Sequence, residues 1–303
     1  MKNLIVLLIV LGSSINALSQ NINYEVVKDE PHEPKVSINL DLFNMDMNTG
    51  VNSELSNLRL ENYSMNIGLF GYVKIIDRLD VDFNVHKSYL TLGRIIFKEY
   101  PGNTELNGGI NLWLTKRNVT RNTKVVLDVK QGSETTTTTF LTIPATLLKR
   151  FGLRAGLYAK SGPFNFNDYA GDGITTPFEQ TKIGSYGVYG GFNSRKITNI
   201  IIKDEKYGRS FSSIGRDIYL DALIIPINRF KDLNDDGANV SQEVQAFKAT
   251  SPIGFRVGYR TFQVEKKKFT GKKFGICGVG EFGYKPYQGW FLTAGFGVTL
   301  VKH

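Results

Sequence analysis

The residues with the clearest chemical potential lie in the segment DLNDDGANVSQE, which begins at Asp232. Its acidic and amide residues and its glycine follow the D-x-[DN]-x-[DN]-G-x5-E spacing of a calcium-binding loop. Calcium prefers oxygen ligands, and a terminal glutamate can supply two of them. The expected ligands are Asp232, Asn234, Asp236, Glu243 and the backbone carbonyl of Ala238. Asn239 stands where such loops usually carry an apolar residue, so an acidic surface turn is the alternative.

A second set of charged residues alternates with apolar residues. In LDVDFNVH, for example, Asp80 and Asp82 alternate with Leu79, Val81 and Phe83. The same alternation places the following charges on one face of their segments: Arg154, Lys160, Arg256, Arg260, Asp80, Asp82, Asp217, Asp221 and Glu281. If that face lines an enclosed space, the charges form a selectivity ladder in a narrow pore. The alternative is that they pair across the interior and brace or close it, because an isolated charge there is costly.

Signatures of catalysis are few. His86 and Ser88 lie on the polar face of one segment, which allows a Ser–His hydrolase as a remote alternative. The chain contains no G-x-S-x-G or H-E-x-x-H motif and no phosphate-binding glycine loop, and its glycines follow the spacing of strands. We therefore expect that the protein is not an enzyme.

The elements that position these residues are predicted to be β-strands, because apolar and polar residues alternate with a period of two. Twelve segments show this pattern: 36–42, 63–75, 79–86, 106–115, 125–130, 140–147, 151–160, 183–203, 214–225, 253–260, 274–284 and 290–301. The last segment has one large apolar face and one face of small residues, which we expect to face lipid and to leave room in a lumen, respectively.

The connections between these segments alternate in length. Short connections are expected at 76–78, 116–122, near 150, 204–208 and 265–272, and long ones at 44–61, 93–103, 131–138, 161–182 and 226–251. Only the final hairpin, from Lys285 to Gly289, departs from the alternation. An even number of strands with short turns on one side and long loops on the other is typical of outer-membrane barrels. A soluble β-sandwich is the alternative.

The first 19 residues predict export, because Lys2 precedes an apolar core from Leu4 to Leu11, and Ala17 and Ser19 have the spacing of a signal-peptidase site. Residues 20–34 are expected to be a flexible lead-in and residues 35–303 the barrel. Cys277 is the only cysteine, so no internal disulfide can stabilise the exported chain. The net charge is +9 with the signal included, and in an exported protein anionic lipid headgroups are a more natural partner than nucleic acid.

With its signal peptide, alternating strands and terminal segment GFGVTLVKH, the chain resembles the outer-membrane β-barrel proteins of Gram-negative bacteria. The resemblance implies an all-β, antiparallel, up-and-down transmembrane barrel of about twelve strands, located in the outer membrane and surrounded by its lipid. The first functional hypothesis is a passive or weakly selective small-solute channel with a calcium-ordered outer loop. The second is a non-conducting barrel that acts as a scaffold for a secretion, adhesion or envelope partner.

Overall fold

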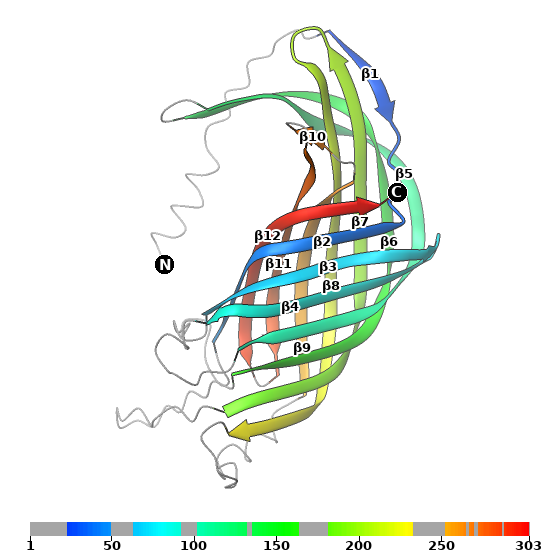
Figure 1. Cartoon of the computed structure of the whole chain (residues 1–303). Helices are drawn as coiled ribbons and strands as arrows, with labels where there is room; N and C mark the ends of the chain where they lie inside the picture. The colour runs from blue at the N-terminus through cyan, green and yellow to red at the C-terminus, as the bar shows by residue number, and fades with distance from the viewer. Residues whose placement is uncertain are drawn as a thin grey trace, which may run out of the picture.

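The computed structural model describes residues 23–49, 63–91, 102–131, 135–163, 181–232, 252–264, 267–269, 272–286 and 288–302, and these form an all-β structure (Figure 1). The strands, in chain order, are β1 (Tyr24–Asp29), β2 (Val36–Asn48), β3 (Tyr63–Ile76), β4 (Leu79–Thr91), β5 (Thr104–Gln131), β6 (Thr136–Pro163), β7 (Thr181–Asp204), β8 (Gly208–Asp232), β9 (Ile253–Gln263), β10 (Lys267–Phe269), β11 (Lys272–Lys285) and β12 (Gly289–Lys302).

The strands belong to one antiparallel sheet that closes on itself. Pairing runs from β7 through β6, β5, β4, β3, β2, β12, β11 and β9 to β8, and β8 pairs back with β7. Ten of the twelve strands therefore form the ring, while β1 and β10 lie outside it, paired with β7 and β11. Closure joins the two ends of the chain, because β12 pairs with β2 from Lys302 opposite Val36 to Phe291 opposite Asn48.

The prediction of twelve alternating ring strands is wrong in its segmentation. The expected short connection at 116–122 lies inside β5, and the one near 150 lies inside β6, so each of these 28-residue strands contains two of the predicted segments. The expected long connection at 131–138 is reduced to the interval between Gln131 and Thr136, at the same end as the short turns. The charged and polar residues of KRNVTRN resemble a turn, but β6 pairs with them along their whole length. The lead-in also contains a strand, β1.

The two faces of the ring differ in chemistry, as the period-two pattern predicts. Along β8, Ile218, Leu220 and Ile224 point outward and are 44%, 50% and 48% exposed, whereas the intervening Asp221 is fully buried inside. The same alternation holds along β4, where Asp80 and Asp82 are buried. The ring is thus apolar outside and charged inside, the reverse of an ordinary soluble core.

The two ends of the ring also differ. At the short-turn end, β3 turns into β4 at 77–78, and β2 begins where β12 finishes. At the opposite, long-loop end, Trp290 stacks on Phe282 with ring centroids 5.6 Å apart, and it meets Phe255 and Tyr284 edge to face at 5.7 and 5.8 Å. This aromatic cluster lies on the outer side of β9, β11 and β12, because its members occupy outward-facing positions.

Strands β5 to β8 continue well beyond the short-turn end and form what we call the sheet extension (Figure 1). It comprises residues 114–131 of β5, 136–146 of β6, 199–204 of β7, 208–213 of β8, and β1. Here β6 leaves β7, and β1 takes its place, pairing from Asp29 opposite Ile200 to Tyr24 opposite Asp204. The Asp29 carboxylate accepts hydrogen bonds from the Thr146 N–H and hydroxyl, at 2.8 and 2.9 Å, where the strands separate.

A small apolar core holds the sheet extension together. It consists of Val125, Ile143, Ala145, Ile200 and Ile202, with Leu127 and Leu141 packed against it. All five central residues are at most 1% exposed. Since β5 and β6 contribute three of them and β7 the other two, burial of these side chains ties the β5–β6 hairpin to β7.

Several predicted features lie outside the described residues. These are the signal peptide at 1–19 and the calcium ligands Asn234, Asp236, Ala238 and Glu243, while Asp232 is described only as the last residue of β8. Within the described ranges, no three His, Cys, Asp or Glu side chains come together in a way that could hold a metal ion. The described ranges also contain no helix with the length and hydropathy needed to cross a membrane.

Candidate functional site

The interior of the ring contains a network of buried charges, which we call the interior network. Its layer nearest the short-turn end is centred on Arg195 of β7, which is 1% exposed. The Arg195 guanidinium donates two hydrogen bonds to Asp217 at 2.8 and 3.0 Å, and one each to Asp80 at 2.6 Å and Glu33 at 2.9 Å. Glu33 also pairs with Arg150 at 2.8 Å, so a residue from the lead-in closes this end of the interior.

Aromatic rings cover the cations of this layer. The guanidinium carbon of Arg195 lies 3.8 Å from the centroid of the Tyr72 ring and 4.9 Å from that of Trp113. The Trp113 indole N–H donates to Asp80 at 2.9 Å, which gives that carboxylate a second donor. Because each buried charge has opposite charges or polarised rings around it, the layer avoids the cost of isolated ions in an enclosed space.

The middle layer joins three arginines to three acidic residues. Arg154 pairs with Asp82 at 2.9 Å and with Asp221 at 3.4 Å, and Arg256 pairs with Asp221 at 2.7 Å. Two further members, Arg260 and Glu281, lie 3.7 Å apart. The Tyr219 ring lies beneath this layer, 4.2 Å from the guanidinium of Arg154 and 4.8 Å from that of Arg260, and its hydroxyl donates to Glu281.

The layer nearest the long-loop end contains the two buried lysines. Lys285 pairs with Glu105 at 2.7 Å and lies 3.9 Å above the ring of Phe291. Lys160 lies between Asp46 at 3.2 Å and Glu105 at 3.6 Å. Asp46 accepts additional hydrogen bonds from Asn103 and Thr293, at 2.9 and 3.1 Å. This layer therefore completes a charged column through the ring.

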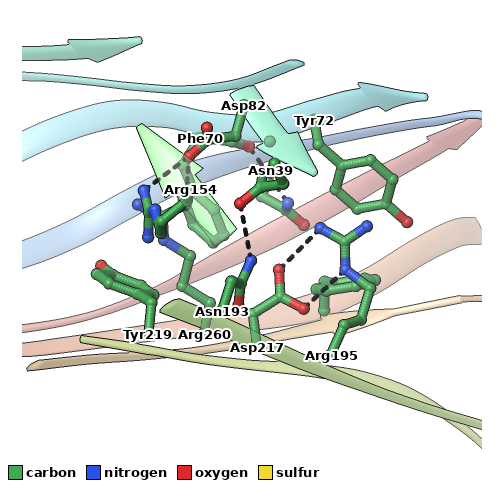
Figure 2. A pocket seen from close by; sticks show the side chains of 13 residues that line it. Asn39, Phe70, Tyr72, Asp82, Arg154, Asn193, Arg195, Asp217, Tyr219 and Arg260 are labelled. Carbon is green, nitrogen blue, oxygen red and sulfur yellow. Dashed lines mark hydrogen bonds and ion pairs between the residues drawn. The ribbon is translucent and has the colours of Figure 1, made fainter. Parts of the chain in front are cut away.

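Apolar side chains also lie in the interior. They form clusters, one of Phe70, Tyr72, Leu148, Ile197, Phe262, Val264, Cys277 and Val279, and another of Tyr158, Tyr189, Leu223 and Ile225. Figure 2 shows the cavity between the first two layers, which is lined by the ion pair Arg195–Asp217, between neighbouring strands, and by the ion pair Arg154–Asp82. This cavity and a second one beside His86 and Glu281 each have room for about one water molecule.

Inward-facing glycines make room for the large aromatic side chains. Gly258 lies directly opposite Tyr219 on the neighbouring strand, and the Tyr219 ring occupies the space that a Cβ atom at Gly258 would need. The Tyr189 hydroxyl fills the equivalent space at Gly109 and Gly156. At these three glycines, the space next to the backbone is taken by a tyrosine side chain of another strand and is not open.

His86 and Ser88 do not form the Ser–His pair considered from the sequence. The His86 Nε2 atom lies 3.2 Å from the Asp41 carboxylate, inside the ring. The Ser88 hydroxyl accepts a hydrogen bond from the Asn103 N–H at 2.7 Å. Each side chain therefore has a different partner.

All nine charges predicted for the lumen lie in the interior and are buried. The structure brings them together with seven further charged residues that the sequence analysis missed: Glu33, Asp41, Asp46, Glu105, Arg150, Arg195 and Lys285. Two of these, Arg150 and Lys285, lay in expected turns, and Glu33 lay in the expected flexible lead-in. If 140–160 had been treated as one continuous strand, the period-two pattern would have placed Arg150 on the inner face, because it lies four residues before Arg154 in β6.

Comparisons with known proteins give little further information. No family model matches the chain, and no curated protein matches it. Among solved structures, a bacterial polysaccharide outer membrane secretin matches with 7% sequence identity and a TM-score of 0.22, over 90% of this chain and all of that chain.

Proposed function

We propose that the protein is an outer-membrane β-barrel with a closed interior, and that it acts as a scaffold in the cell envelope. The observation that carries this proposal is the reversed distribution of side chains, with large apolar residues outside the ring and buried charges inside. A sheet meets lipid only when every backbone group is paired, and closure of the ring provides that pairing. The outward apolar positions of β8 that no charge interrupts extend from Ile218 to Ile227, which matches the roughly 9–11 residues of a tilted membrane strand, and Arg216 separates them from one more outward apolar residue, Ile214.

The packing of the interior favours the non-conducting hypothesis over the channel. Arginine, lysine and carboxylate side chains cross the ring in three layers, and the two cavities described above each have room for about one water molecule. A solute passing through would have to separate pairs such as Arg256–Asp221, which lies 2.7 Å apart with both side chains fully buried. Such a separation leaves charges without partners, and its cost rises with burial.

The sheet extension supports the scaffold role. Next to β4, the backbone pairing of β5 ends with the hydrogen bond from the Trp113 N–H to the carbonyl of Arg78, in the turn before β4, at 2.8 Å. Beyond it, no strand in the described part of the chain pairs with that edge of β5. An unpaired edge offers backbone donors and acceptors to an incoming strand. The edge carries Lys116, Arg117, Arg121, Lys124 and Lys130 against one acid, Asp128, so an acidic extended segment is the complementary partner.

The first test is single-channel conductance of the refolded mature protein in planar bilayers, with heat-modifiable gel migration as the check that a barrel has formed. We expect a folded barrel without conductance steps. Stable open steps that change when Arg256 or Arg260 is replaced by Gln would overturn the closed interior and restore the channel hypothesis. Failure to insert or to show heat-modifiable migration would contradict the outer-membrane barrel itself.

The second test concerns the partner. A photoreactive residue is placed at Asn118 or Asn122 on the β5 edge, and at Thr198 as the control, because Thr198 lies opposite Leu147 on one side and Ile214 on the other. In intact cells, we expect one defined protein adduct from the two edge positions and none from Thr198. Equal labelling at all three positions, or labelling at none, would refute docking at this edge.

The calcium loop remains a separate proposal within this function. If Asp232 and Glu243 are ligands, calcium raises the resistance to protease of the segment that follows β8, up to residue 251, and Asp232→Ala or Glu243→Ala abolishes that rise. Asp128→Ala, in the sheet extension, is the matched control and should leave the response unchanged. If protease digests this segment of the wild-type protein equally fast with calcium and with a chelator, the calcium proposal is refuted and the motif is an acidic surface turn.

A further inference from the structure

Four basic residues form a row across the outer face of four neighbouring strands. Arg117 of β5 lies directly opposite Lys149 of β6, Lys149 opposite Lys196 of β7, and Lys196 opposite Arg216 of β8. We call this row the cation ladder. Directly opposite residues in antiparallel strands have Cβ atoms about 4.5–5.5 Å apart, and like charges in such positions repel. The sheet therefore holds four positive charges in line at an energetic disadvantage.

The cation ladder faces outward and has no counter-charge on the described part of the protein. Arg117 and Arg216 are exposed, and Lys149 and Lys196 are partly exposed. The neighbouring residues on the inner face, such as Arg150 and Arg195, belong to the interior network instead. Among the described residues, the carboxylates that form ion pairs do so with other cations. The ladder therefore presents four positive charges without an ion-pair partner in the described part of the protein.

The ladder lies at the short-turn side of the continuous apolar belt, and one more outward row, Val119, Leu147, Thr198 and Ile214, lies beyond it. Two residues closer to the middle of the ring, Phe151 and Ile218 occupy the next outward positions of β6 and β8, and each is 44% exposed. Ser194 lies between these two residues, and the next outward row towards the middle of the ring consists of Leu153, Phe192 and Leu220, all of them apolar. The ladder is therefore placed at the headgroup level of a membrane around that belt, at the short-turn end and next to the sheet extension.

We propose that the cation ladder binds the phosphate groups of anionic glycerophospholipids in the leaflet at the short-turn end. This inference rests on the proposed function, because it needs the apolar belt to lie in lipid. Closely spaced phosphates of neighbouring headgroups match the row in charge and in depth, and they neutralise the repulsion between adjacent cations. Bound lipid on one side of the ring also fixes the orientation of the sheet extension relative to the membrane surface.

The test measures selectivity for lipid headgroups. Full-length mature protein is reconstituted into phosphatidylcholine vesicles, and electron spin resonance compares the association of spin-labelled phosphatidylglycerol with that of spin-labelled phosphatidylcholine. We expect wild-type protein to prefer the anionic lipid by at least about fivefold, the preference that one basic residue near a lipid surface provides. The variant Lys149→Gln/Lys196→Gln/Arg216→Gln should lose most of that preference.

A matched control removes the same kinds of charge elsewhere. Lys203→Gln/Lys206→Gln/Arg209→Gln changes two exposed lysines and one exposed arginine at the far end of the sheet extension, and it should keep the wild-type preference. The charge-conserving variant Lys149→Arg/Lys196→Arg/Arg216→Lys should keep it as well. Heat-modifiable migration of every variant reports whether the ring has folded.

The outcomes separate this inference from the proposed function. An inserted, heat-modifiable wild-type protein without headgroup preference would refute the lipid site and leave the barrel intact. A preference that the control variant loses equally would assign it to general charge, which also overturns the proposal. If inorganic phosphate displaces the lipid more strongly than chloride at equal ionic strength, the ladder binds free phosphate instead. A wild-type protein that fails to enter vesicles contradicts the proposed function itself.

Discussion

Replacement of Arg195 by methionine tests whether the interior network stabilises the closed ring. Methionine keeps the unbranched shape of the side chain and removes its charge. Of the three acidic partners, Glu33 keeps Arg150 at 2.8 Å and Asp80 keeps the Trp113 N–H at 2.9 Å. Asp217 loses both of its hydrogen bonds from the Arg195 guanidinium. Asp80 and Asp217 both lose their ion-pair partner, so the main consequence is two buried carboxylates without a cation, of which Asp80 still accepts the Trp113 hydrogen bond.

Loss of one partner from a buried ion pair costs about 3–5 kcal/mol of unfolding free energy, because the remaining charge stays desolvated. We expect Arg195→Met to fall in this range. The double variant Arg195→Met/Asp217→Asn removes the unpaired charge of Asp217 and leaves that of Asp80, and it should recover about 1–3 kcal/mol relative to the sum of the two single variants. Arg209→Met, at an exposed position in the sheet extension, is the control and should change the unfolding free energy by less than about 0.5 kcal/mol.

The assay is reversible guanidinium unfolding of the protein in lipid vesicles, followed by tryptophan fluorescence. Trp113 and Trp290 are the two tryptophans of the chain, and the Trp113 ring lies 4.9 Å from the Arg195 guanidinium, so the signal reports on this layer. If Arg195→Met costs no more than Arg209→Met, or if the costs of the two single changes simply add, the reasoning about the network is refuted.

Three further predictions use the same unfolding assay. Gly258→Ala should lower the unfolding free energy by about 1–3 kcal/mol, because the new methyl group overlaps the Tyr219 ring. Gly108→Ala, which has no atom within 4 Å of the added Cβ, is the control and should lower it less. Equal effects of the two changes would contradict this account. Leu220→Arg should cost about 2–4 kcal/mol in lipid, but almost nothing if that face met water. The hydrogen bond from Lys74 and its positive charge lower the pKa of Asp77 from 3.8. Asp77 therefore contributes stability above pH 3.8 that is lost as the pH falls through its lower folded pKa, and Asp77→Asn should remove this acid dependence.

The class of fold and the chemistry of its two faces follow from the sequence. In a strand, successive side chains point to opposite faces, so the period-two pattern of LDVDFNVH indicates without any tertiary information that Asp80 and Asp82 share a face. The same local rule placed Arg154 with Lys160 and Arg256 with Arg260. These assignments depend only on neighbours in the chain.

Segment boundaries were harder to predict, because a run of polar residues resembles a turn wherever it occurs. KRNVTRN reads as a connection, yet it continues β5 because β6 pairs with it beyond the ring. Glu33 reads as part of a flexible lead-in, but it lies between Arg150 and Arg195. Contacts with residues distant in the chain decide both cases, and local composition does not predict such contacts.

The sequence by itself therefore determined that the chain forms strands with one apolar and one charged face. Tertiary structure alone decided how many strands close the ring, which carboxylate each arginine meets, and that Arg117, Lys149, Lys196 and Arg216 lie in one row. The physical reason is that alternation is a property of a single strand, whereas register, closure and ion pairing depend on residues far apart in the chain, such as Lys285 and Glu105, which are 180 positions apart.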